Sequence, residues 1–166
     1  MKRLKNKIVD FFAILIGALV FILFLPFILI SIPFDWIKQR KVDKEFKEYL
    51  LSLGDKNFFC YNNRTEAKDF IEKELLPKLN DQIEVIYLEG REPKSKFVKN
   101  FISLALYRLK NYNKFPHLFK VRNGELMDES INNEFYNTMN QNKPLDKLLQ
   151  RVNLFFDLTE EKKNAA

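Results

Sequence analysis

The pattern of apolar and polar positions divides the chain into one long apolar run and a series of shorter amphipathic segments. The run covers Ile8–Ile32, and no charged residue occurs between Phe11 and Phe34. At about 1.5 Å per residue, a helix of roughly 25 residues is long enough to cross a hydrocarbon core of about 30 Å. The pattern therefore predicts a transmembrane anchor over residues 8–34.

The flanks of the run favour an uncleaved anchor over a signal peptide. A basic N-terminus, residues 1–7, precedes the run, which is longer than the apolar part of a typical signal peptide. Pro33, Phe34 and Trp36 follow it in place of a small-residue cleavage motif, and then several bases, as at a membrane interface. We expect a single pass through the cell membrane with the soluble domain on the cytosolic side. A shallow hairpin turning near Pro26 is the alternative.

A short amphipathic helix is predicted directly after the anchor. Asp43–Leu53 places Phe46 and Leu50 on one helical face. Gly54 is expected to end this helix, because glycine readily takes the left-handed conformation that terminates helices. We interpret residues 35–54 as a juxtamembrane helix or stalk.

The rest of the chain alternates between strand and helix patterns. His117–Met127 is a predicted hairpin, because Asn123 and Gly124 suit the positive φ angles of a two-residue turn. The order β-α-β-α-β-β-α predicts a three-layer α/β domain over 55–158, with a parallel first β-α-β unit. A charged tail, 159–166, follows it. Strands are predicted at Lys56–Asn62 and Gln82–Leu88, and helices at Thr65–Leu79, Lys96–Leu109 and Pro144–Leu158.

One stretch of the domain is unusually rich in asparagine. Ser130–Asn142 contains Phe135, Tyr136 and Met139 among its amides. Because asparagine favours turns, we expect a loop that these larger side chains hold against the domain. A partner-binding surface is the alternative, because aromatic side chains and amides suit adaptable recognition.

The distribution of charge limits the partners. The chain has a net charge of +6, yet residues 1–10 hold four bases and one acid, and residues 49–166 hold 19 bases and 17 acids. The domain therefore lacks the basic surface of a nucleic-acid-binding protein. The expected partners are the lipid bilayer and another membrane or membrane-associated protein.

The segment Lys114–Leu126, KFPHLFKVRNGEL, resembles the proline loop, strand, tight turn and strand of the thioredoxin fold. The resemblance extends from about Lys56 to Asp157. It implies a thioredoxin-like domain and a cis peptide bond between Phe115 and Pro116, because the proline of that family is cis and faces the active site.

The chain departs from the family at the redox centre. The family's Cys-x-x-Cys pair lies where the first strand meets the first helix, and here that spacing joins Cys60 to Asn63. A dithiol exchange needs a second thiol, and the sequence contains one cysteine. Cys60 lies in an aromatic strand, where a buried, unreactive thiol is the usual case. A single-cysteine (monothiol) oxidoreductase or transferase that uses Cys60 is the alternative.

The sequence thus favours a redox-inactive thioredoxin-like domain that acts as a binding or scaffolding module on a membrane anchor. We expect no cofactor and no metal, and we expect His117, the single histidine, to be a hydrogen-bonded surface residue. A purely structural subunit of a membrane complex is a third class. The resemblance implies a site at the start of the domain's first helix, opposite the proline loop, and a free helix N-terminus there suits an anionic or peptide ligand. The expected binding residues are Asn62, Asn63, Arg64, Phe115, Pro116 and His117.

Overall fold

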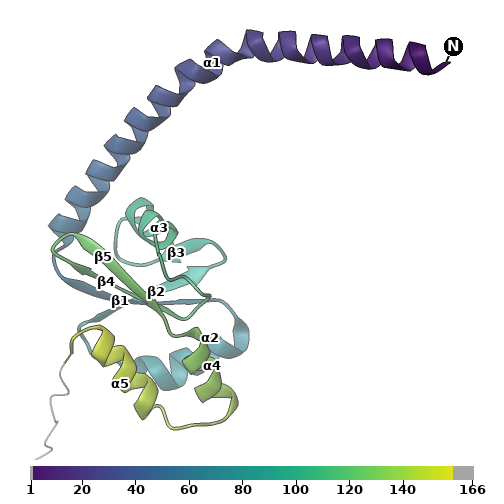
Figure 1. Ribbon diagram of the computed structural model, residues 1–166. Coiled ribbons are helices and arrows are strands. Elements are labelled where there is room, and N and C mark those ends of the chain that lie inside the picture. Colours follow the sequence, from purple (N-terminus) through teal and green to yellow (C-terminus); the bar gives the residue numbers. More distant parts are fainter. Residues whose placement is uncertain (1, 159–166) are drawn as a thin grey trace, which may run out of the picture. The chain divides into compact units, whose positions relative to one another are not determined.

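The structure, a computed structural model, describes residues 2–158 (Figure 1). Within the first helix, it describes the side chains of residues 10, 11, 13–27 and 36–53. The chain divides into two compact units, Met1–Glu45 and Phe46–Ala166. The predicted tail, 159–166, lies outside the described residues, as do the side chains of the predicted basic N-terminus.

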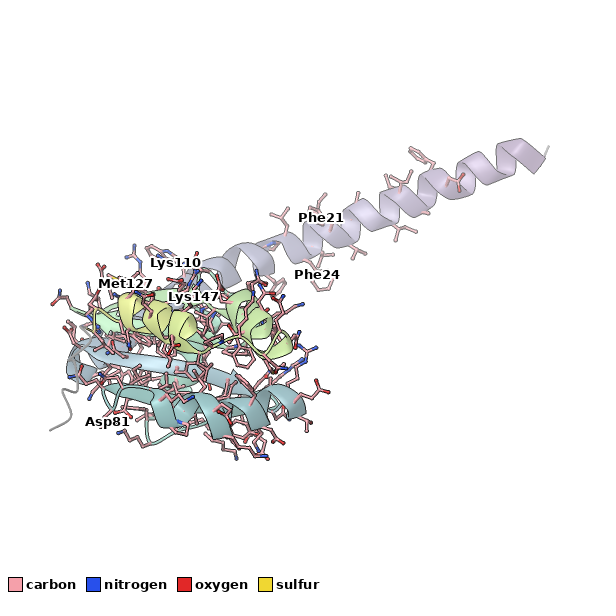
Figure 2. The ribbon with its side chains drawn as sticks, turned by 90° about the horizontal axis from the view of Figure 1, so that it is seen from below. Phe21, Phe24, Asp81, Lys110, Met127 and Lys147 are labelled. Carbon is pink, nitrogen blue, oxygen red and sulfur yellow. The ribbon has the colours of Figure 1, made fainter. Side chains whose placement is uncertain are left out.

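The first unit consists of the helix α1, Lys2–Leu53, up to Glu45. The helix continues through Pro26, so the alternative of a hairpin turning there is wrong. Phe21 and Phe24 project from it as exposed side chains (Figure 2). In the part of the chain that the structure describes, no helix is both long enough and apolar enough to cross a membrane. The transmembrane anchor stays a prediction of the sequence.

The second unit is built on a five-stranded sheet in the order β3-β2-β1-β4-β5. β1 pairs with β2 in parallel, and the other pairs are antiparallel. The parallel first β-α-β unit and the antiparallel hairpin at the sheet edge are therefore confirmed, and Asn123 and Gly124 have the expected positive φ angles. The strands are β1 (Lys56–Asn62), β2 (Ile83–Glu89), β3 (Glu92–Lys94), β4 (His117–Arg122) and β5 (Glu125–Ser130).

Helices cover both faces of the sheet, which gives the predicted three layers (Figure 1). The last turns of α1 and α3 pack on one face, and α2, α4 and α5 pack on the other. The predicted helix at Thr65–Leu79 is α2 followed by a π turn and a 3-10 turn that contains Pro77. The helical segments are α2 (Thr65–Phe70), η1 (Ile71–Leu75), η2 (Leu76–Lys78), α3 (Lys99–Tyr107), α4 (Asn132–Asn140) and α5 (Asp146–Phe155).

The central strand β1 supplies side chains to both faces. Side chains alternate along a strand, so Phe58 and Cys60 enter the layer of α1 and α3, whereas Phe59 and Tyr61 enter the layer of α2, α4 and α5. Phe58 stacks on Phe119 of β4 with the ring centroids 4.5 Å apart. A strand buried on both faces requires the continuous apolar run that the sequence has here.

The structure corrects the predicted stalk. Phe46 and Leu50 are buried against the sheet, so the compact unit begins at Phe46, inside the range 35–54 that we interpreted as a stalk. Close packing continues at the hairpin, where a Cβ on Gly124 would lie 2.6 Å from Cδ2 of Leu51. The apolar stripe of this helix is a core face, because the sheet offers a surface that buries it.

The structure also corrects the predicted loop at Ser130–Asn142, most of which is the helix α4. Ile131 and Phe135 are fully buried and lie four residues apart, on one helical face. Asparagine has only a modest intrinsic preference against helix, which the burial of these two side chains outweighs.

Candidate functional site

The candidate site lies where the carboxyl end of β1 leads into α2. Asn62, Asn63 and Arg64 meet the loop 110–116 and Tyr136 of α4 there. They enclose an open hollow of about 330 Å³, and a second hollow of about 600 Å³ adjoins it and shares Arg64, Lys114 and Tyr136. We call the two hollows together the Arg64 groove. The first is lined by Asn62, Asn63, Arg64, Tyr112, Lys114, Phe115 and Tyr136, and the second by Arg64, Thr65, Glu66, Ala67, Lys114, Asn132, Tyr136, Met139 and Asn140.

Arg64 is held against α4 from across the groove. Its Nη1 donates a hydrogen bond of 3.2 Å to the hydroxyl oxygen of Tyr136, and its Cζ lies 5.5 Å from the centre of that ring. A guanidinium carries five N–H donors, so this contact leaves most of them for a ligand. Among the residues that the structure describes, neither Arg64 nor Lys114 forms an ion pair.

The loop 110–116 is positioned by the buried carboxylate of Asp128 on the edge strand β5. This carboxylate accepts hydrogen bonds from the backbone N–H of Lys110 at 3.0 Å and of Asn111 at 2.8 Å. The side-chain amide of Asn111 donates in return to the carbonyl oxygen of Asp128 at 2.9 Å. Three hydrogen bonds therefore fix the start of the loop that carries Tyr112 and Lys114.

Two further hydrogen bonds fix the end of the loop. The hydroxyl of Ser130 donates to the carbonyl oxygen of Asn113 at 2.9 Å, and the amide of Asn132 donates to that of Phe115. Lys114 between them has a φ angle of +62°, in the left-handed region. The peptide bond from Phe115 to Pro116 is cis, as the resemblance implied.

His117 is buried, so the prediction of a surface histidine is wrong. Its Nε2 lies 3.0 Å from Asp128 Oδ2, and its ring lies 5.7 Å from that of Tyr112. Nδ1 is also buried, with no hydrogen-bond partner among the described residues. Burial, which disfavours the charged ring, lowers the pKa of His117, and the adjacent Asp128 only partly opposes this. His117, directly after Pro116, thus faces the core. The sequence pattern did not reveal this burial.

Cys60 is buried as well, in the layer of α1 and α3. Its exposed fraction is 0 %, and it pairs in register with His117 of β4. Burial raises the pKa of the Cys60 thiol well above its ordinary value, because a thiolate would lose its hydration there. The nucleophile of thiol chemistry is the thiolate, so this environment makes Cys60 unreactive at neutral pH.

The structure brings together four of the six expected binding residues. Asn62, Asn63, Arg64 and Phe115 line the first hollow, whereas Pro116 and His117 lie beneath it in the interior. The sequence analysis missed three other lining residues, Tyr112, Lys114 and Tyr136. Tyr136 belongs to the asparagine-rich stretch for which we considered a partner-binding surface, and Lys114 begins the segment that resembles the proline loop, whereas no signal in the sequence indicated Tyr112.

Neither a metal site among the described residues nor a match to a known protein indicates a role for the Arg64 groove. Among the side chains that the structure describes, no three of histidine, cysteine, aspartate or glutamate lie close enough together to hold a metal ion. No protein-family model, curated protein or solved structure matches the chain. The resemblance to the thioredoxin fold therefore stays a prediction.

Proposed function

We propose that residues 46–158 form a redox-inactive, thioredoxin-like binding module that takes a segment of a partner protein in the Arg64 groove. One observation carries this proposal. Arg64 and Lys114 line one open groove together with amides and phenol rings, and neither cation forms an ion pair among the described residues. Exposed cations and aromatic rings in one hollow are typical of recognition surfaces.

The burial of Cys60 argues against the monothiol alternative. A thiol transferase must expose its sulfur to a second thiol or disulfide, and its thiolate must be populated near neutral pH. Cys60 is fully buried, and its raised thiol pKa keeps the sulfur protonated. A binding function therefore agrees with the exposed side chains of the Arg64 groove, whereas thiol chemistry does not agree with the burial of the Cys60 thiol.

Attachment to a membrane through α1 is the second part of the proposal, and it rests on the apolar run of the sequence. The described large apolar side chains from Ile14 to Phe27 are all exposed. Exposed apolar surface of this extent is rare in a protein that no lipid or partner covers. Bound to lipid, α1 would hold the module beside membrane proteins, which suits a scaffolding role.

Alkaline extraction of membranes from cells that express the full chain tests this attachment. We expect the chain to stay in the pellet, and a variant with Leu19→Arg and Phe24→Arg to be released. Each charge at a bilayer centre opposes insertion by about 3 kcal/mol. Release of the unchanged chain would contradict membrane attachment, and the proposed binding function of the groove would still stand.

Site-specific photo-cross-linking in cells tests the groove itself. A benzophenone amino acid at position 63, in the groove, should capture a distinct protein. The same group in place of Asp81, an exposed residue just before β2, is the control and should not capture it. Adding Arg64→Glu and Lys114→Glu to the position-63 chain should abolish the adduct. An adduct that survives these two changes, or that forms equally from both positions, would overturn the assignment of the groove.

A further inference from the structure

The first hollow of the Arg64 groove has a net positive charge that nothing in the described structure neutralises. Arg64 and Lys114 are its only charged lining residues, and they are fifty positions apart in the sequence. Glu66 lines the second hollow but not the first. Elsewhere in the unit, exposed lysines such as Lys73 and Lys94 have carboxylate partners within 4.0 Å. Two uncompensated cations in one small hollow repel each other until an anion binds between them.

The backbone conformation of Lys114 indicates that the charge of this side chain is held at a specific position. Its φ of +62° lies in the left-handed region, which residues other than glycine, asparagine and aspartate seldom adopt. The hydrogen bonds to the carbonyl oxygens of Asn113 and Phe115 hold the chain on either side of it. Unfavourable backbone conformations of this kind concentrate at ligand-binding positions, where the surrounding structure enforces them.

The donors around the two cations match the oxygens of a phosphoryl group. Arg64 keeps unused N–H groups in a planar fork, which binds phosphate oxygens in pairs, and Lys114 adds a point charge. Asn62 and Asn63 contribute amide groups, and among the described residues none of their side chains forms a hydrogen bond. The hollow thus offers donors from several directions and no carboxylate.

From this geometry we infer that the hollow binds a phosphate monoester, carried by a phosphorylated segment of the partner protein. This inference rests on the proposed function. A monoester carries a charge of about −1.5 to −2 at neutral pH, which balances two cations, whereas a carboxylate would balance one. The phosphodiester of common lipid headgroups also carries a single charge, so a protein-borne monoester fits better than the membrane surface.

The size and walls of the hollow fit the group that carries the phosphate. A volume of about 330 Å³ is at the small end of ligand pockets, enough for a phosphoryl group and a side chain attached to it. Tyr112 and Phe115 contact each other edge to face, with centroids 5.4 Å apart, and form an apolar wall for that side chain. The second hollow, with Asn132 and Met139, offers a path for the adjoining peptide.

Titration of the full chain in alkyl maltoside micelles, which contain no phosphate, tests the inference. Phenyl phosphate and O-phosphoserine are the probes, amide chemical shifts of Asn63, Arg64 and Lys114 are the readout, and acetate is the comparison anion. We expect saturable binding of a monoester, at least about tenfold weaker binding of acetate, and a loss of about tenfold or more in each of Arg64→Gln and Lys114→Gln. The control variants Lys73→Gln and Lys78→Gln should bind as the unchanged chain does.

Two results would overturn the inference. One is the absence of saturable monoester binding at millimolar concentration, and the other is binding that Arg64→Gln and Lys114→Gln leave unchanged. All four substituted side chains are exposed, and thermal melting of each variant verifies that it is folded.

Phosphatase treatment before the cross-linking at position 63 separates this inference from the proposed function. Loss of the adduct supports a phosphorylated partner. An adduct that persists would support the binding module and contradict the inference of a phosphorylated partner. No adduct before treatment contradicts the proposed function itself. Vesicles of phosphatidylcholine with a phosphoinositide monoester should displace O-phosphoserine from the groove no more strongly than phenyl phosphate does, and much stronger displacement would assign the site to the membrane instead.

Discussion

The interior beneath the Arg64 groove and the rim of that groove contain opposite kinds of side chain. The interior holds Cys60 and His117, the two residues best suited to chemistry, and both are fully buried. The rim holds Arg64, Lys114 and Tyr136, which are suited to recognition and accessible from solvent. The side chains suited to chemistry are therefore buried here, whereas the cations are exposed.

The interior and the rim are linked through Asp128. The carboxylate of Asp128 accepts hydrogen bonds both from His117 in the interior and from the loop whose Lys114 reaches the rim. The buried polar cluster thus acts as a support that fixes the rim. Substitutions in the interior should change stability strongly, and substitutions at the rim should change binding while stability stays nearly constant.

Asp128→Ala should have the largest effect. It leaves the partly buried N–H groups of Lys110 and Asn111 and the buried Nε2 of His117 without an acceptor. Hydrogen bonds to a charged group contribute about 1.5–3 kcal/mol each, so we expect the free energy of unfolding to fall by about 3 kcal/mol or more. Chemical denaturation measures this change, and Asp81→Ala, at an exposed position, is the matched control and should change it by less than about 0.5 kcal/mol.

Cys60→Ser should have the next largest effect. The substitution places a hydroxyl in an apolar layer, and burial of an unpaired hydroxyl destabilises proteins by about 1–3 kcal/mol. Cys60→Ala, which introduces no polar group, should destabilise less. Alkylation with iodoacetamide gives a separate measure of burial, and the native thiol should react far more slowly than the denatured one. Native and denatured rates that are alike would make Cys60 a surface residue and restore the thiol alternative.

The pH dependence of stability should show the burial of His117. Its pKa is lowered in the folded state, so the unfolded chain binds the proton more readily below the ordinary value of 6.5. The contribution of His117 to stability is therefore complete above that pH and is lost as the pH falls towards the folded pKa. The slope for one proton is at most about 1.4 kcal/mol per pH unit.

Denaturation of the unchanged chain and of His117→Gln between about pH 7.5 and 5 measures this contribution. The glutamine amide keeps a donor near Asp128 and does not titrate. Asp128 and Glu129 lie near position 117 in both proteins, so their contribution largely cancels in the difference. A difference that is independent of pH would mean that His117 is hydrated in the folded protein.

Much of the fold follows from the sequence, because local patterns determine it. The aromatic run at Lys56–Asn62 identified the strand β1, and Asn123-Gly124 identified the hairpin. The sequence did not identify α4, because the burial of Phe135 depends on a sheet face that only the folded chain provides. For the same reason, the last turns of α1 were taken for a stalk.

The candidate site was only partly predictable from the sequence. Asn62, Asn63 and Arg64 were proposed because they lie at one strand-to-helix junction, where the resemblance to the thioredoxin fold implies a site. Lys114 and Tyr136 come from other elements, and their approach to Arg64 depends on how the loop and α4 pack. The burial of His117 depends on which face of β4 its side chain occupies. The position of His117 directly after a proline does not reveal that face.

Arg64→Gln should have the smallest effect on stability and a clear effect on binding. Its exposed hydrogen bond to Tyr136 stabilises the fold by less than about 0.5 kcal/mol, because solvent competes for both groups. The free energy of unfolding should therefore stay nearly constant while the affinity for a phosphate monoester falls. Tyr136→Phe is the informative control, because it removes the same hydrogen bond and keeps the cation. If both variants lost affinity equally, Arg64 would act by holding α4 in place. If only Arg64→Gln lost affinity, the charge itself would bind the ligand, as the contrast between the rim and the interior requires.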